Sequence, residues 1–144
     1  MKSIIGLVDV NDRKAALSSL WVFVMFCIAY ADLIGLIEPG MLQKIINGEL
    51  GITITPGMVL LLSIIQAIPI CMILVSRWVR RAVNRRANIA AVALTLVYVL
   101  GGGNWESTSY FVFATLEVLA LLGIFWAAWT WRSIDDDSIQ SSQE

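Results

Sequence analysis

The chain of 144 residues contains no histidine, only two cysteines and only three prolines. Without histidine it lacks the usual axial ligand of a haem and the His-containing ligand sets of zinc sites. Cys27 and Cys71 are far apart in the sequence, form no CxxC spacing and each lie in an apolar stretch. They are interpreted as small buried side chains and not as a redox pair or a disulfide. We therefore predict no metal and no cofactor.

Charged residues are also few, at 15% of the chain with a formal net charge of −1. Soluble domains carry roughly 25% charged residues. A chain without excess positive charge offers no basic surface for nucleic acid, so we expect no nucleic-acid partner. The sequence contains no phosphate-binding loop, dinucleotide fingerprint or hydrolase nucleophile motif. Whether the protein is an enzyme therefore stays open.

The sequence instead has four long apolar stretches, at residues 17–37, 57–76, 87–103 and 110–131. Each is close to the roughly 20 helical residues that cross the hydrocarbon layer of a membrane. Segments such as MVLLLSII and ALLGIFWAAW are apolar on every side, whereas a soluble bundle would have polar outer faces. We therefore predict an all-α fold, a four-helix transmembrane bundle.

The distribution of Lys and Arg predicts how these spans are oriented. Nine of the ten cations lie in segments that an even number of spans puts on one side of the membrane, and only Lys44 lies on the other. In membrane proteins the cytoplasmic side carries this excess. We therefore predict a multi-pass protein of the inner membrane with both termini in the cytoplasm. Its predicted parts are a cytoplasmic N-terminal segment at 1–16, a four-span membrane domain at 17–132 and a disordered acidic tail at 133–144.

Local signals predict the structure outside the spans. Asn11 or Asp12 is the expected N-cap of the first helix. Residues 40–47, GMLQKIIN, place apolar side chains on one face, which predicts a short external helix in the membrane interface between spans one and two. Pro56 suits the first turn of the second span. The segment GGGNWESTS is expected to form a tight outer turn.

Every span carries a polar side chain in its outer half. At 1.5 Å per residue, Asp32 lies roughly 8 Å inside the outer end of span one and Glu117 roughly 10 Å inside that of span four. Tyr98 and Gln66 occupy the outer halves of spans three and two. A charged group deep in lipid costs about 2.5–3.5 kcal/mol, so such residues normally face the bundle interior or water. We therefore predict one interior polar site that opens to the outside.

Helical phase supports an interior site. Polar and small residues of span three recur at steps of three or four, which puts them on one face. These residues are Asn84, Asn88, Ala91, Thr95, Tyr98 and Gly102. Glu117 shares a face with small residues that allow close helix packing. The candidate residues for binding a ligand or a proton are Asp32, Glu117, Tyr98, Gln66, Thr95 and Tyr30.

A purely structural role is the alternative for these residues. Gln66, Tyr98 and Thr95 can act as interhelical hydrogen-bond partners, each contributing about 0.6–2 kcal/mol. Asp32 and Glu117 have no basic residue beside them within the membrane. Since burial and a like-charged neighbour both favour the neutral acid, we expect one of the two to hold a proton at neutral pH. Both acids can also be structural, and Asp32 can simply be hydrated near the interface.

Three functions remain open on the sequence. The leading hypothesis is a membrane protein that binds or transports a cation, a proton or a small ligand through its buried acids. An intramembrane enzyme acting on a lipid-like substrate, with Asp32 and Glu117 as general acid and base, is the first alternative. An accessory subunit of a membrane complex is the second. The expected partners are membrane lipids and, because four helices enclose little volume, further copies of the chain in a homo-oligomer.

The sequence resembles an uncharacterised family of small four-span bacterial membrane proteins, a domain of unknown function. The matching stretches are DRKAALSSLWVF, YADLIGLIEPG, IPICMILVSR and RRANI. The resemblance covers all but the tails and implies four helices with a polar core, without a catalytic signature. The family pattern favours an acid at the position of Gln66, so this chain keeps a pair of acids in place of three. A likeness to DoxX-type four-helix proteins concerns the fold alone.

Overall fold

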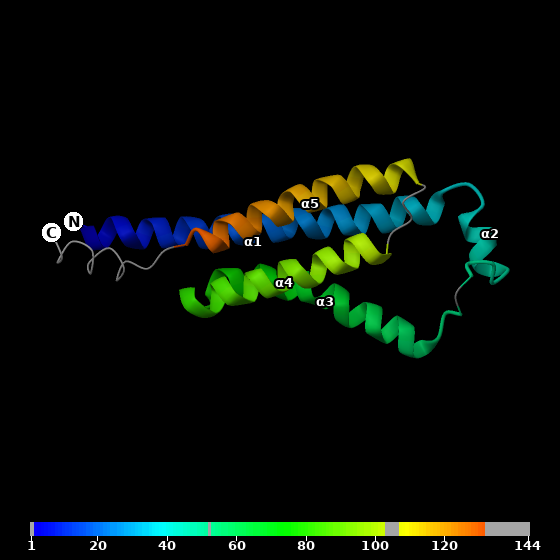
Figure 1. The fold of residues 1–144 in the computed structure, drawn as a ribbon, viewed down its shortest axis with the longest axis horizontal. Coiled ribbons are helices and arrows are strands. Elements are labelled where there is room, and N and C mark those ends of the chain that lie inside the picture. Colours follow the sequence, from blue (N-terminus) through cyan, green and yellow to red (C-terminus); the bar gives the residue numbers. More distant parts are fainter. Residues whose placement is uncertain (1, 52, 103–106, 132–144) are drawn as a thin grey trace.

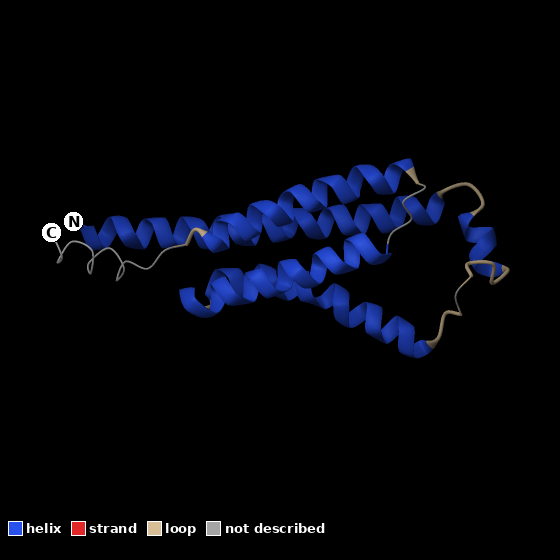
Figure 2. Cartoon of the chain, in the orientation of Figure 1, coloured by secondary structure: helices blue, strands red, loops and turns tan. Residues whose placement is uncertain are grey.

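The computed structural model describes residues 2–51, 53–102 and 107–131, with side chains from residue 11 onward. In these residues the elements are α1 (Lys2–Ile37), α2 (Met41–Ile46), α3 (Pro56–Trp78), α4 (Arg81–Gly102) and α5 (Thr108–Trp129). The described part contains helices and loops but no strand (Figure 2). Four of the helices, α1, α3, α4 and α5, are long and apolar enough to cross a membrane. The predicted all-α fold with four spans is confirmed, and the protein is a multi-pass membrane protein.

The helix that was predicted at residues 40–47 is present as α2, and Figure 1 shows it running across the axis of α1. Its position in a membrane interface stays a prediction. The tight turn predicted around GGGNWESTS has its centre at residues 103–106, outside the described residues. The acidic tail predicted at 133–144 lies outside them as well.

The start of α1 differs from the prediction. Asn11 and Asp12 were the expected N-caps, but the helix runs without a break from Lys2. No proline lies between Lys2 and Ile37, and an Asn or Asp inside a helix costs only about 0.7 kcal/mol relative to Ala. The expected N-cap is therefore wrong, and α1 extends beyond the ends of α3 and α4 (Figure 1).

The starts of α3 and α5 follow ordinary capping chemistry. Pro56 occupies the first turn of α3, as predicted, and the Thr55 hydroxyl accepts a hydrogen bond from the Met58 N–H at 3.2 Å. At the start of α5 the Ser107 hydroxyl accepts from the Tyr110 N–H, also at 3.2 Å. Each cap satisfies one of the N–H groups that the first turn of a helix leaves without a partner.

The four long helices pack in a ring: α1 contacts α3 and α5, and α4 contacts the same two helices. A fully buried core of Leu17, Trp21, Leu121 and Ile124 lies between them. The N-terminal half of α3 diverges from α4 and α1 toward the end of the bundle that carries α2 (Figure 1). We call this end the α2 end, and the opposite end, where α3 joins α4, the arginine end. The helix α3 thus lies close to its neighbours toward the arginine end and away from them toward the α2 end (Figure 1).

A buried hydrogen-bond network joins α1, α3 and α4 in the arginine-end half. Trp21 Nε1 donates to Asn88 Oδ1 at 2.7 Å, and Ser76 Oγ donates to the same oxygen at 3.3 Å. Asn88 Nδ2 donates to Asn84 Oδ1 at 2.6 Å, and Asn84 Nδ2 donates to the Ser76 carbonyl at 2.6 Å. Hydrocarbon offers no replacement for these partners. The network therefore holds three helices in one relative register below the candidate site.

Substituting Asn88→Leu should test this network. The change removes Asn88 Oδ1, which accepts from Trp21 and Ser76, and Asn88 Nδ2, which donates to Asn84. Buried polar groups of these three residues then lose their partners. We expect a loss of roughly 1–3 kcal/mol in the free energy of unfolding in detergent. The matched control is Thr115→Val, because Thr115 is exposed and bonds only within its own helix. Equal stability of the two variants would show that the network contributes nothing.

Candidate functional site

Three of the candidate residues line one small cavity in the α2-end half of the bundle. They come from three helices: Asp32 from α1, Tyr98 from α4 and Glu117 from α5. The volume of the cavity is about 40 Å³. A water molecule needs roughly 10–15 Å³ of such space. The cavity beside Glu117 therefore has room for water molecules or a small ion.

Among the described acids of this half, Glu117 is the most enclosed, with 3% of its surface exposed. Ala114 and Ala120 are buried on the same face of α5, and their small side chains allow the neighbouring helices to approach. The described residues include no hydrogen-bond partner for its carboxyl group. An isolated buried charge is costly, which makes this carboxyl a candidate binding group.

Asp32 is more exposed than Glu117 and links the small cavity to α3. Gln66 Nε2 donates to Asp32 Oδ2 at 3.4 Å, which is long for a hydrogen bond. The other amide atom, Gln66 Oε1, is buried and has no partner among the described residues. The α1–α3 contact at this level therefore contains an acceptor that a donor or a cation would satisfy.

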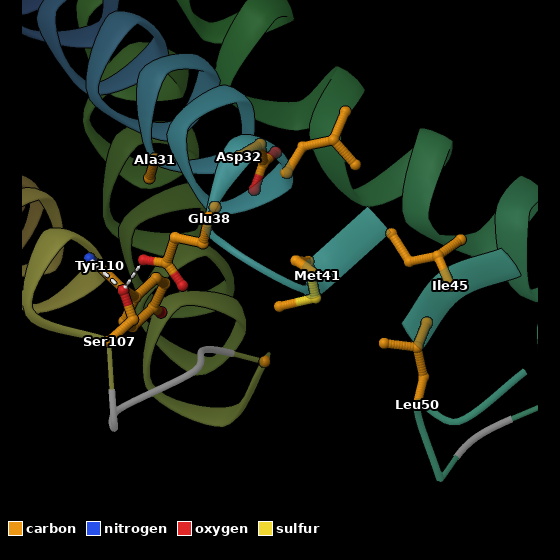
Figure 3. Close-up of a pocket in the computed structure, with 11 residues that line it drawn as sticks. Ala31, Asp32, Glu38, Met41, Ile45, Leu50, Ser107 and Tyr110 are labelled. Atoms are coloured by element: carbon orange, nitrogen blue, oxygen red, sulfur yellow. Dashed lines mark hydrogen bonds between the residues drawn. The ribbon is translucent and has the colours of Figure 1, made fainter. Parts of the chain in front are cut away.

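A second cavity of about 270 Å³ lies between Asp32 and α2. Figure 3 shows its wall of apolar side chains, Met41 and Ile45 from α2 and Leu50 from the loop that follows. The two cavities share four lining residues, which are Ala31, Asp32, Gly102 and Tyr110. The spaces therefore adjoin, and a species that moves from the α2 end to Glu117 passes Asp32.

Glu38 joins the ends of α1 and α5 at the rim of the larger cavity. Its carboxylate accepts hydrogen bonds from the hydroxyls of Ser107 and Ser109, and Figure 3 shows the first of these. The bond from Ser107, followed by that from Ser109, holds the pKa of Glu38 below its ordinary value of 4.5, because both stabilise the charged form. Glu38 follows the last residue of α1 and is not part of a span.

Comparison with known proteins places the chain in a family. The family model described as a family of unknown function, DUF6326, matches residues 6–138. The chain belongs to DUF6326. No curated protein and no solved structure matches it. The predicted resemblance to a family of unknown function is confirmed, and the membership adds no known activity.

The candidate residues of this DUF6326 protein do not all meet. Asp32, Tyr98 and Glu117 line one cavity, and Gln66 reaches it only through its contact with Asp32. Thr95 is buried on the interior face of α4 but lines neither cavity. A binding role for these side chains stays a prediction.

Tyr30 lies apart from the other candidates. It is 50% exposed, stacks on Phe26 with ring centroids 6.4 Å apart, and lines neither of the two cavities. The reason is helical phase, since Tyr30 lies two positions before Asp32, which turns the chain by about 200°. Tyr30 is therefore placed away from the cavities on which the two acids meet.

Two residues of the DUF6326 site were missed by the sequence analysis. Tyr110 lines both cavities and donates through its hydroxyl to the Val99 carbonyl. Its position seven residues before Glu117, two helical turns away, is a signal that would have placed it on the same face. Glu38 gives no such signal, because its partners are distant in the sequence. They are Ser107 and Ser109, at the start of α5.

The pH dependence of stability should report the Glu38 bonds. A carboxylate with a lowered folded-state pKa contributes stability above its unfolded value near 4.5 and loses it as pH falls through the folded value. We expect the thermal midpoint of the wild type to fall as pH is lowered below about 4.5, and Glu38→Gln to reduce that fall. Glu49→Gln, in the exposed loop after α2, is the control and should leave the profile unchanged. A Glu38→Gln profile identical to that of the wild type would contradict the role of these bonds.

Substitutions at Glu117 should distinguish an interior carboxyl from one that faces water. Glu117→Gln keeps the shape and polarity, so we expect the free energy of unfolding to change by less than about 1 kcal/mol. Glu117→Lys buries a long cation in a space of about 40 Å³, and we expect a loss of more than about 3 kcal/mol or no folded protein. Yield and thermal midpoint in detergent measure both. A stable Glu117→Lys protein would mean that the side chain is not enclosed.

Proposed function

We propose that this membrane protein binds a proton or a small monovalent cation through Asp32 and Glu117. The observation that carries the proposal is the enclosed carboxyl of Glu117, which has no partner among the described residues and shares a water-sized cavity with a second acid. No Lys or Arg is among the described residues that line this cavity or the adjoining one. Two acids without a basic partner favour a positively charged occupant.

The ligand set favours a proton or a monovalent ion over a divalent one. Within the described residues no group of three or more acidic, histidine or cysteine side chains is placed to hold a metal ion. Calcium takes six to eight oxygen ligands, and magnesium requires octahedral geometry. Two carboxyl groups with neighbouring tyrosine hydroxyls are better matched to a proton or to a small ion of single charge.

The two acids are suited to different roles. Asp32 borders the larger cavity and accepts a hydrogen bond from Gln66, so it is the acid that a cation entering from the α2 end would meet first. Glu117 lines the small cavity, and it is the group that would take up and release the proton or the cation. Tyr98, on the cavity wall, offers a hydroxyl that can donate to a carboxylate or coordinate a cation.

The alternatives receive less support. An enzyme acting on a lipid-like substrate needs room for the reacting group beside both acids, and the space that both acids line is small, at about 40 Å³. An accessory subunit would present its polar residues to a partner, whereas Asn84, Asn88 and Thr95 are buried inside the bundle. These observations favour binding of a small cation or a proton.

Transport across the membrane is a further step of the same proposal. Toward the arginine end the described residues form a closely packed core, so a path beyond Glu117 would require a rearrangement or a homo-oligomer. The distribution of Lys and Arg supports an inner-membrane orientation with both termini in the cytoplasm. In that orientation the two cavities face the outside.

A carbodiimide experiment tests the proposal. Dicyclohexylcarbodiimide, an apolar reagent, modifies carboxyl groups in their protonated form. We expect it to label Glu117 at pH 5, with less labelling at pH 9 as the proton is lost and less labelling when sodium ions compete for the site. Mass spectrometry of proteolytic fragments identifies the modified residue and measures the extent of labelling.

Matched variants make the labelling result specific. Glu117→Gln should remove the label, and Asp32→Asn should change its dependence on pH because it removes the neighbouring charge. Glu49, which is exposed, serves as an internal comparison that sodium ions should not protect. Absence of label at Glu117, or labelling that neither pH nor sodium changes, would refute the proposed binding site.

A further inference from the structure

Five arginines gather where α3 joins α4, at the arginine end of the bundle. They are Arg77 in the last turn of α3, Arg80 in the link, and Arg81, Arg85 and Arg86 in the first two turns of α4. We call this set the arginine cluster. The sequence has no acidic residue between Glu49 and Glu106, so neither helix supplies a counter-charge. The described residues form no salt bridge with any of the five.

Two members of the arginine cluster are held in place by α5 and the residues after it. Arg81 Nη2 donates to the Trp131 carbonyl at 3.3 Å, and the guanidinium of Arg85 lies over the ring of Trp129 at 5.7 Å from its centroid. Arg85 Nε is buried and has no hydrogen-bond partner among the described residues. A buried donor without a partner destabilises the structure that encloses it. Within the described part of the chain, Arg85 Nε therefore lacks an acceptor, and the cluster lacks a counter-charge.

The surroundings of the arginine cluster are those of a membrane interface. Trp78, the last residue of α3, is 76% exposed, and tryptophan favours the headgroup level of a bilayer. Ile70, Leu74 and Trp78 follow one another at steps of four residues, so they form an exposed apolar stripe along α3. The N-terminus of α4 adds the positive end of its helix dipole. Charge and apolar surface thus adjoin at the end of the spans.

We propose that the arginine cluster binds the phosphate of an anionic phospholipid headgroup, with an acyl chain along Ile70, Leu74 and Trp78. The planar guanidinium group donates two parallel hydrogen bonds to phosphate oxygens, which a point charge cannot do. A free phosphate ion would meet the charge requirement but would leave the apolar stripe unused. An anionic phospholipid would meet the charge requirement with its phosphate and cover the apolar stripe with an acyl chain. This site is independent of the cation site at the α2 end.

Lipid titration of the purified protein in detergent tests the proposal without depending on its orientation in cells. Native mass spectrometry would compare phosphatidylglycerol with phosphatidylcholine, which carries no net charge. Each basic residue near anionic lipid contributes about fivefold in affinity. We expect preference for phosphatidylglycerol, and a reduction of roughly 25-fold in its binding when Arg77 and Arg80 are both changed to Gln. These two are chosen because both are exposed.

Control variants separate a lipid site from a loss of folding and from a general effect of charge. Lys44→Gln, at the α2 end, should leave phosphatidylglycerol binding unchanged, and Arg77→Lys with Arg80→Lys should restore part of what the Gln pair loses. An unchanged thermal midpoint of the Gln pair would show that folding is intact. Equal binding of the two lipids, or no effect of the Gln pair, overturns the proposal.

Two further outcomes would also overturn the proposed phospholipid site. If inorganic phosphate displaces the lipid at equal concentration, the site is one for a free anion. If phosphatidylglycerol binds only after residues 133–144 are removed, the acidic tail and not a lipid neutralises the arginine cluster.

Discussion

The absence of hydrogen-bond partners in hydrocarbon is the constraint on which the rest of this structure depends. It requires the polar side chains of the spans to lie inside the bundle or to bond within their own helix. The effect is clearest in α4, where Asn84, Asn88 and Thr95 are buried while Leu94 and Val97 are exposed. α4 therefore presents its polar face to its neighbours, and the other spans arrange around that face.

The two halves of the bundle answer this constraint differently. Toward the arginine end, the amides of Asn84 and Asn88 are matched with donors and acceptors from α1 and α3. Toward the α2 end, α3 diverges, Gln66 Oε1 is buried without a partner among the described residues, and Glu117 lines a cavity. Matched groups stabilise the fold, whereas unmatched groups are available to a ligand. The structure thus separates a stabilising polar network from a candidate binding site along a single helix face.

Much of the fold was predictable because its signals are local and repetitive. Runs of about 20 apolar residues indicate four spans, and the period of three to four residues identifies the interior face of α4. Pro56 indicated the start of α3, because proline is common in the first turn of a helix. The start of α1 was not predictable from Asn11 and Asp12, because capping residues also occur inside helices at small cost.

Sequence alone determined that Asp32 and Glu117 lie at similar depths without a basic partner, since depth follows from counting residues along helices of known rise. Only the tertiary structure decided that the two acids share one cavity, that Tyr30 lies away from it and that Tyr110 belongs to it. Rotation of each helix about its axis and the separation between helices are set by side-chain packing across distant parts of the chain. The size of the cavity and the Glu38–Ser107 bond depend on that packing, and no local pattern in the sequence encodes them.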